Sequence, residues 1–294
     1  MAEPAGNFDA WLGRTETRGD TIDPKPALGL AALLDWPDSP VVSETPGAPL
    51  PPLWHWCYFL ETARQSEIAA DGHARRGGFL PPIDLPRRMW AGGRFRFHHP
   101  LRIGESVIRR SRIESIEQKQ GRSGPLAFVR VAHEYESPAG LAFSEAQDIV
   151  YRGAEPVAGA TGQAARKTAA NDLEADFQRE TQAGAVMLFR YSALTFNAHR
   201  IHYDRDYARD IEGYPGLVVH GPLLATLLLD ELLRQYPHRE LREFSFRALA
   251  PVFDTDPLRL CGTRPGAGGE CALWVANSAG STCLRGEAKL PPPP

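Results

Sequence analysis

The 294-residue chain lacks the patterns that would place it in a membrane, outside the cell or on nucleic acid. No apolar run of about 18 residues is free of charges, which argues against a membrane-spanning helix. The first residues show no basic segment followed by an apolar core, so we expect no secretory signal. The formal net charge of -3 gives no basic surface for nucleic acid. We therefore expect a cytoplasmic globular protein without a membrane or nucleic-acid partner.

Cysteine is scarce, and the four that occur are widely separated: Cys57, Cys261, Cys271 and Cys283. They form no CxxC pair, and their spacing does not resemble that of a zinc site. Buried, reduced thiols are the simpler interpretation in a cytoplasmic protein. The sequence thus predicts neither a metal site nor another cofactor.

Large apolar residues are almost missing from residues 153–172, whose sequence is GAEPVAGATGQAARKTAAND. A small, polar segment of this kind is typical of a linker. It would divide the chain into an amino-terminal domain, residues 1–152, and a carboxy-terminal domain, residues 173–294. Within the first, residues 36–54 are too rich in proline for regular structure and predict a long surface loop.

The two halves resemble each other weakly but in order. Pro100 matches Pro251, Glu105 matches Asp256, and the segment SPAG at 137–140 matches NSAG at 277–280. Residues 129–135 alternate between apolar and polar, as in a half-buried strand, and each matched segment ends on a glycine suited to a hairpin turn. We expect a repeated strand, turn, strand unit.

A helix is predicted over residues 222–236, where leucines cover more than one face. A helix that is apolar on most sides must be surrounded by other structure. Four strand-like segments follow it, over residues 242–253, 258–264, 271–277 and 282–290. An antiparallel sheet curled around one buried helix, the hot-dog architecture, accommodates all of them. Two copies in one chain would make an α+β double hot-dog.

The first half offers a weaker helix over residues 52–72, interrupted by charges. No cluster of ionisable residues precedes it. In the second half, by contrast, the segment FNAHRIHYDRDYA at 196–208 lies shortly before the buried helix. We therefore expect the chemistry in the second half.

This segment resembles the active-site motif of the MaoC-like hydratases and dehydratases. Their motif runs aspartate, any residue, asparagine, proline, aliphatic residue, histidine, then a small residue, and precedes a His-Gly pair at the start of the buried helix. Here Ile201-His202 takes the place of the aliphatic-histidine pair, Ala208 that of the small residue and His220-Gly221 that of the His-Gly pair. The resemblance covers the second half, and the first half looks like the partner domain of fused family members, which contributes to coenzyme A binding.

The departures from the motif fall on its first positions. The family aspartate is replaced by Asn197, the asparagine by His199 and the proline by Arg200. An amide is not a base at neutral pH, so Asn197 can only orient the nucleophilic water. His202 is the expected acid/base group, because an unperturbed imidazole titrates near neutral pH. His199 is expected to be a second acid/base group or a substrate contact.

Two further residues are expected to take part in catalysis. Asp204 would replace the lost carboxylate by orienting His202, with a solvated carboxylate or a helix cap as the alternative. Gly221 would present its backbone N–H, at the first turn of the helix, to the thioester oxygen that becomes an enolate. We also expect Tyr203 and His220 to contact substrate.

Arg200 suggests the substrate class. A charged residue beside an acyl chain needs an anionic partner, which a free carboxylate on the acyl group would supply. The alternatives are solvent and the phosphates of coenzyme A. Among family members, the variant FNxHRIHYD looks like that of mesaconyl-CoA and itaconyl-CoA hydratases, which make citramalyl-CoA.

For coenzyme A itself, the segment PRRMWAGGRFRFHH offers a weak candidate site in the first half, made of cations and one aromatic ring: Arg87, Arg88, Trp90 and Arg94. The favoured function is therefore a cofactor-free hydratase acting on a short dicarboxylic acyl-CoA. A 3-hydroxyacyl-thioester dehydratase of fatty-acid metabolism and a non-catalytic thioester-binding protein are the alternatives. Assembly stays open between a monomer and a homodimer.

Overall fold

The structure, a computed structural model, describes residues 7–36, 45–121, 124–153 and 173–292. Its ten strands form one antiparallel sheet in the order β1-β3-β4-β5-β2-β7-β10-β9-β8-β6. The strands of the first half are β1 (Thr15–Thr21), β2 (Arg87–Phe97), β3 (Ser106–Gly121), β4 (Gly124–Ser137) and β5 (Gly140–Arg152). Those of the second half are β6 (Phe177–Thr181), β7 (Glu243–Ala248), β8 (Leu258–Gly262), β9 (Glu270–Asn277) and β10 (Thr282–Lys289).

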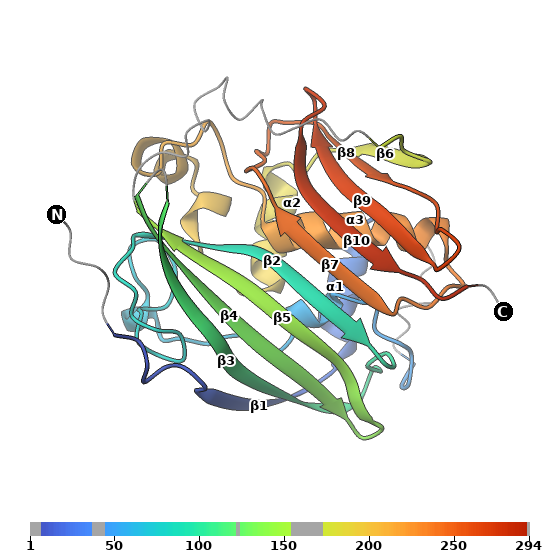
Figure 1. Ribbon diagram of the computed structural model, residues 1–294, viewed down its shortest axis with the longest axis horizontal. Helices are drawn as coiled ribbons and strands as arrows, with labels where there is room; N and C mark the ends of the chain where they lie inside the picture. Colours follow the sequence, from blue (N-terminus) through green and yellow to red (C-terminus); the bar gives the residue numbers. More distant parts are fainter. Residues whose placement is uncertain (1–6, 37–44, 122–123, 154–172, 293–294) are drawn as a thin grey trace.

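The sheet repeats its topology about the pairing of β2 with β7. From its outer edge inward, the first half has the order β1-β3-β4-β5-β2 and the second half the order β6-β8-β9-β10-β7. In both halves this is the first, third, fourth, fifth and second strand. Strands β2 and β7 pair antiparallel, with Gly93 opposite Phe246, so main-chain hydrogen bonds continue from one half into the other. The internal repeat and the α+β double hot-dog predicted from the sequence are confirmed (Figure 1). The predicted linker lies almost entirely outside the described residues.

The helices are α1 (Pro24–Leu33), α2 (Ala185–Leu194) and α3 (Gly221–Gln235), and they lie on one face of the sheet (Figure 1). Short 3-10 turns η1 (Trp54–Cys57), η2 (Gln65–Glu67) and η3 (Arg200–His202), and one π-helical turn η4 (Tyr207–Ile211), lie in the connections. Helix α3 is buried from Leu223 to Leu232 and contacts β2, β8, β9 and β10. The prediction of a helix surrounded by the sheet is confirmed.

The repeat matches hold in the turns as well. Gly140 and Gly280 both have positive φ, of 103° and 79°, at the hairpins that follow β4 and β9. In β4 the alternating residues Val129, Val131 and Tyr135 are buried. The four cysteines are buried and free, as expected.

The predicted helix over residues 52–72 is wrong, since only η1 and η2 form there. Leu53 and Phe59 have φ of 71° and 54°, values that a right-handed helix excludes. The buried residues follow one another directly, including Trp54, His55 and Cys57, so they do not form one helical face. The helix of this half is instead α1, which begins after Asp23, whose carboxylate accepts a hydrogen bond from the N–H of Lys25.

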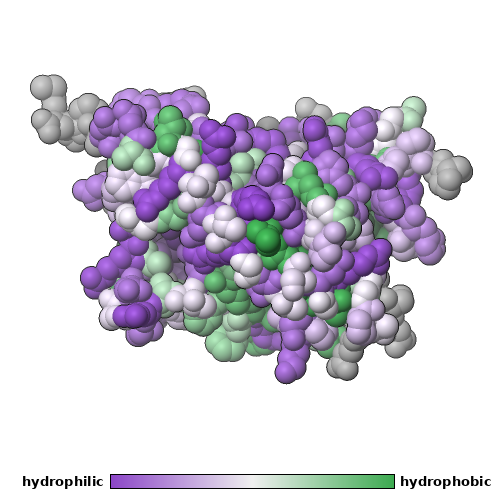
Figure 2. All heavy atoms as spheres, turned by 90° about the horizontal axis from the view of Figure 1, so that it is seen from below, coloured by the Kyte–Doolittle hydropathy of each residue, from purple (hydrophilic) through white to green (hydrophobic). Residues whose placement is uncertain are grey.

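The molecular surface is mostly polar on the face seen from below Figure 1. Hydrophilic residues cover most of that view and the apolar ones form small groups (Figure 2). In the part of the chain that the structure describes, no helix is both long enough and apolar enough to span a membrane.

Candidate active site

A cavity of about 900 Å³ lies where the two halves meet. Its walls come from the connection before β2, from β2 to β5, from the end of α2 and the segment that follows it, and from the start of α3. Exposed apolar side chains surround part of it, among them Phe189 and Phe196, which are 64% and 60% exposed. A cavity of this size can hold the acyl end of a thioester.

His202 is held in one tautomer by the main chain. It is the last residue of η3, and its Nδ1 lies 2.7 Å from the carbonyl oxygen of Val218. Because a carbonyl can only accept, Nδ1 carries the proton and the lone pair is on Nε2. The side chain is buried and lines the cavity. Burial lowers the pKa of His202 to about 4, against the effect of the Val218 carbonyl, so the ring is a neutral base near pH 7.

His220 lies flat against His202. The two ring centroids are 3.7 Å apart and the planes differ by 19°. Nε2 of His220 is 2.9 Å from Oγ of Ser192, while Nδ1 is buried and, among the described residues, has no hydrogen-bond partner. Burial and the neighbouring histidines lower the pKa of His220 well below its usual value. The stacked ring therefore holds His202 in place without adding charge.

Gly221 begins helix α3 directly beside this pair of rings, and it lines the cavity. The N–H groups of a first helical turn have no partner within the helix, and Pro222 next to Gly221 has no N–H at all. The Gly221 N–H is thus a donor at the positive end of the α3 dipole. An added Cβ would lie 3.5 Å from the carbonyl oxygen of Trp90, so β2 closes one side of this position.

Asn197 shapes the chain rather than meeting His202. Phe196, just before it, has a φ of 49°, an uncommon value for a residue with a side chain. This turn lets Oδ1 of Asn197 accept a hydrogen bond from the N–H of His199 at 3.0 Å. Both Asn197 and His199 line the cavity. Burial, with the rings of His73 and His202 nearby, lowers the pKa of His199 to about 2.

The structure differs from two expectations for this segment. Asp204 does not orient His202, because its carboxylate accepts from Arg200 at 2.8 Å and from the N–H of Tyr207 at 3.0 Å. It acts as the helix cap that was the alternative. Arg200 is in turn neutralised by Asp204, donates to the carbonyl of Ala70 and lies 4.1 Å above the Tyr207 ring. Arg200 is not among the residues that line the cavity.

Tyr203 does line the cavity, but it is 46% exposed and its hydroxyl donates to the carbonyl of Ala198 at 3.1 Å. Its exposure places it at the entrance of the cavity rather than in the interior, where His202 is buried.

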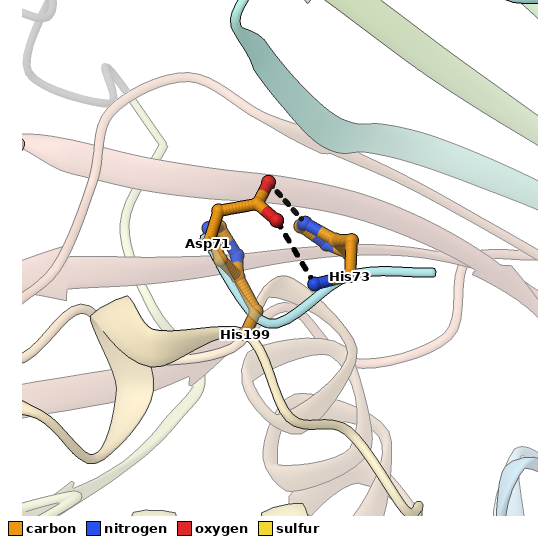
Figure 3. A group of neighbouring side chains, drawn as sticks. All are labelled: Asp71, His73 and His199. Carbon is orange, nitrogen blue, oxygen red and sulfur yellow. Dashed lines mark hydrogen bonds and ion pairs between the residues drawn. The ribbon is translucent and has the colours of Figure 1, made fainter. Parts of the chain in front are cut away.

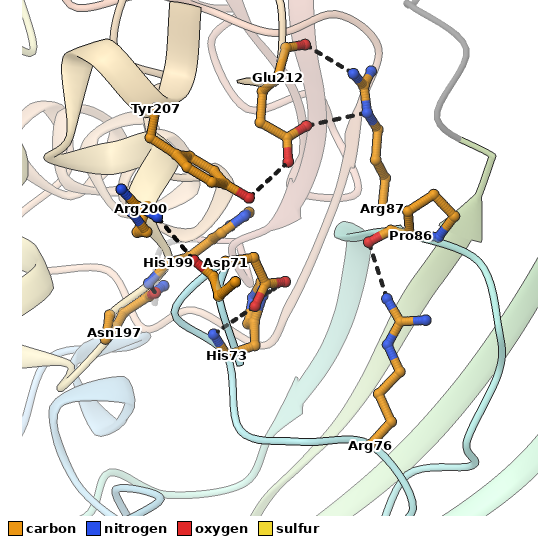
Figure 4. A network of polar contacts seen from close by, with 12 residues as sticks. Asp71, His73, Arg76, Pro86, Arg87, Asn197, His199, Arg200, Tyr207 and Glu212 are labelled. Atoms are coloured by element: carbon orange, nitrogen blue, oxygen red, sulfur yellow. Dashed lines mark hydrogen bonds and ion pairs between the residues drawn. The ribbon is translucent and has the colours of Figure 1, made fainter. Parts of the chain in front are cut away.

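Of the proposed coenzyme A group, Arg87, Arg88 and Trp90 line the cavity and Arg94 does not. Arg94 pairs with Asp148 at 2.8 Å on the surface of the sheet. Arg87 is bound to Glu212, 3.1 Å from its carboxylate and 2.8 Å from its carbonyl oxygen (Figure 4). The sequence segment therefore contributes to the cavity, but the register shift in β2 between Trp90 and Gly92 offsets the alternation of strand faces, so that Arg94 points away from the cavity that Arg88 lines.

Asp71 and His73 were not predicted from the sequence. They belong to the first half, between η2 and β2, yet they lie against His199 (Figure 3). Oδ2 of Asp71 is 2.9 Å from Nδ1 of His73, and Oδ1 accepts from the His73 N–H at 3.0 Å. The His73 and His199 ring centroids are 4.1 Å apart. The only sequence signal is the pattern Asp-Gly-His, in which Gly72 permits a close approach.

That approach is made by the backbone. Gly72 has a φ of 93°, and an added Cβ would lie 1.7 Å from the carbonyl oxygen of Ala198. The N–H of Arg200 also donates to the carbonyl of Asp71 at 2.9 Å. One ligand atom each from Asp71, His73 and His199 lie within 4.8 Å of one another, a spacing compatible with a cation. The hydrogen bond between Oδ2 of Asp71 and Nδ1 of His73 already occupies one atom of each of these two residues.

Comparison with known proteins places this arrangement in a family. A family model described as hydroxyacyl-thioester dehydratase type 2 matches residues 53–254, which contain both histidine groups. The chain belongs to this family. Because the family is defined by hydro-lyases, the protein is an enzyme of that class.

Two relatives of this dehydratase family show how far the similarity extends. The chain is 50% identical over 286 residues to the mesaconyl-C(4)-CoA hydratase of Chloroflexus aurantiacus, covering 97% of this chain and 99% of the relative. It is 30% identical over 251 residues to the mitochondrial hydroxyacyl-thioester dehydratase type 2 of Schizosaccharomyces pombe, covering 77% and 80% of the two chains.

Solved structures agree with the fold. A MaoC-like dehydratase from Phytophthora capsici superposes with a TM-score of 0.71 over 98% of this chain and 100% of its own, at 15% identity. A Mycobacterium tuberculosis protein described as a double hot-dog superposes with a TM-score of 0.60, over 95% and 96% of the two chains, at 14% identity. The MaoC-like resemblance of the sequence is confirmed.

Proposed function

We propose that this hydro-lyase adds water to the double bond of a short, unsaturated dicarboxylic acyl-CoA, with mesaconyl-C(4)-CoA as the first candidate and citramalyl-CoA as the product. The observation that carries the proposal is the orientation of His202. Its protonated Nδ1 is fixed on Val218, which leaves a basic Nε2 beside the amino end of α3 in a cavity between the halves. The 50% identity to a mesaconyl-C(4)-CoA hydratase supports the substrate class.

The chemistry follows from charge. When water adds to the carbon β to the thioester, the thioester oxygen becomes an enolate oxygen. The Gly221 N–H and the α3 dipole would stabilise that charge, a type of contact whose removal costs about 3–4 kcal/mol. His202 exchanges a proton with the α-carbon, which is bonded to the thioester carbon and therefore lies beside Gly221.

The free carboxylate of a diacid needs a cation, and Arg88 suits this role better than Arg200. Arg88 lines the cavity and is half-buried. Among the described residues it forms no ion pair with a carboxylate, whereas Arg87 is held by Glu212 and Arg200 by Asp204. It lies close enough to His73 and His199 to lower the pKa of both rings. A bound carboxylate would therefore sit at the His73 side of the site.

A second candidate is dehydration of a 3-hydroxyacyl thioester with a plain acyl chain. The family description and the 30% identity to the yeast mitochondrial dehydratase favour it. It requires the same His202 and Gly221 chemistry and makes no use of Arg88.

The two are separated by measuring loss of enoyl absorbance with mesaconyl-C(4)-CoA, itaconyl-CoA and crotonyl-CoA, which lacks the second carboxylate. We expect efficient hydration of a diacid thioester, loss of all activity in His202→Gln, and an Arg88→Met loss confined to the diacids. Crotonyl-CoA turned over as well as the diacids would favour the second candidate. No turnover of any enoyl thioester would refute hydratase function.

A further inference from the structure

We propose that His73, positioned by Asp71, is the second catalytic acid/base group of this enzyme, so that the amino-terminal half supplies part of the catalytic machinery. The inference rests on the hydratase function proposed above. It answers the question raised by Asn197, which stands where the related motif has a carboxylate and cannot exchange a proton with water.

The histidines form a row across the cavity. From the α3 end the rings follow in the order His220, His202, His199 and His73, with centroid separations of 3.7, 5.3 and 4.1 Å. His220 directly precedes Gly221, and His202, stacked on it, is the second ring from the end where the thioester would bind. His73 lies at the other end, where Arg88 would take the free carboxylate. In mesaconyl-C(4)-CoA the β-carbon carries that carboxylate, so the carbon that gains the hydroxyl lies on the His73 side.

Within the described part of the chain, His73 is the one ring of this row with a carboxylate partner. His202 is held by a backbone carbonyl, His220 by a serine hydroxyl, and His199 lies between two rings. Oδ2 of Asp71 accepts from Nδ1 of His73 at 2.9 Å, which fixes the tautomer and leaves Nε2 for proton exchange. Burial alone would raise the pKa of Asp71, but the bonds from His73 hold it well below its usual value. Asp71 is therefore charged and can balance an imidazolium at His73.

The proton steps are simplest to follow in the dehydration direction. Nε2 of His202 takes the α-proton. The electron pair of the broken C–H bond moves toward the thioester oxygen, which accepts a hydrogen bond from the Gly221 N–H. The C–O bond at the β-carbon then breaks while the His73 imidazolium gives its proton to the departing hydroxyl, which leaves as water. Hydration is the reverse. After each dehydration His202 carries one extra proton and His73 has lost one, so one proton must return from His202 to His73. The His199 ring lies between them.

The substrate itself would prepare His73. Burial lowers the pKa of His73, Asp71 opposes this, and the charges of Arg88 and Arg76 lower it further. The neutral ring of His199 lies against His73, and the buried ring of His202 is also close enough to interact with its charge. A carboxylate bound at Arg88 would cancel one of these positive charges. A diacid thioester would therefore favour the imidazolium that dehydration needs, which a plain acyl chain would not.

The test separates the two ends of the row by what they do to the product. Citramalyl-CoA is incubated in D2O with the full-length enzyme and with His73→Gln, Asp71→Asn and His98→Gln, an exposed control. Exchange of the α-proton reports His202, and formation of the enoyl thioester also requires His73. We expect His73→Gln to lower dehydration and hydration about 10²–10⁴-fold while α-proton exchange persists. Asp71→Asn should give a smaller loss and a shifted pH profile, and the control should match the wild type.

Three results would overturn the inference. The first is a His73→Gln variant that hydrates the diacid thioester as fast as the wild type. The second is a His73→Gln variant that loses α-proton exchange and dehydration to the same extent while its melting temperature is unchanged. Alternatively, EDTA could abolish wild-type activity and zinc restore it, which would make these residues a metal site. If the wild-type enzyme hydrates no enoyl thioester, the proposed function fails, and this outcome is distinct from an active enzyme that is indifferent to His73.

Discussion

Replacing Gly72 with alanine should strongly lower the rate of catalysis. An alanine Cβ at this position would meet the Ala198 carbonyl oxygen at 1.7 Å, whereas contacts below 3.0 Å essentially never occur. The segment that bears Asp71 and His73 would have to separate from the segment that bears His199 by more than about 1 Å, and misplacement on that scale can cost about 10²-fold in turnover. A hundredfold loss corresponds to about 2.7 kcal/mol of transition-state stabilisation.

The stability of the same variant can be compared with a matched control. Gly77 lies in the same connection and has a φ of 95°, close to the 93° of Gly72, but a Cβ there would meet only Pro82 at 3.7 Å. Gly77→Ala should therefore show only the cost of a left-handed alanine, about 1–2 kcal/mol in urea unfolding, with normal hydration of the diacid thioester. Equal turnover in the two alanine variants would show that the Gly72 contact does not set the geometry of the site.

Two further predictions concern the buried charges and the histidines. Glu145 is buried in the first half and accepts hydrogen bonds from Trp56, Tyr135 and Gln147, with His55 3.1 Å away, so Glu145→Leu should lower the free energy of unfolding by about 3 kcal/mol or more. Urea unfolding measures this free energy, with the exposed residue variant Glu134→Leu as the control. An equal loss of unfolding free energy in the two variants would contradict the prediction. The pKa values of His202 and His199, about 4 and about 2, lie below the value near 6.5 of an unfolded chain. The unfolded state therefore binds more protons below pH 6.5, and stability should fall as pH drops from 6.5 toward 4, by up to about 1.4 kcal/mol per pH unit for each histidine. The melting temperature should fall less steeply with decreasing pH in His202→Gln than in the wild type. An unchanged slope would be evidence against a buried, neutral His202 ring.

The sequence was most informative where pattern and burial coincide. Alternation in β4, positive-φ glycines after β4 and β9, and the leucines of α3 each follow from one local periodicity, and together they define the double hot-dog. The helix expected at 52–72 failed because the aromatic residues there are buried by the chain turning back on itself. A composition rich in apolar residues does not distinguish that arrangement from a helix.

The site was predictable only in its local part. His202, His220 and Gly221 lie near one another in the sequence and at a spacing that a known motif defines. Asp71 and His73 approach His199 from more than 120 positions away, and no local pattern encodes that contact. Arg200 illustrates the reverse problem, since a carboxylate four residues later, Asp204, neutralises it before any substrate can.

The β2–β7 pairing also bears on how this catalyst behaves on dilution. The Asp71–His73 pair and the His202–His220 pair reach the cavity from opposite sides of that junction, on one polypeptide. Their stoichiometry is fixed at one to one, and their effective concentration is set by a covalent connection rather than by encounter between chains. Assembly of the site should therefore be independent of protein concentration.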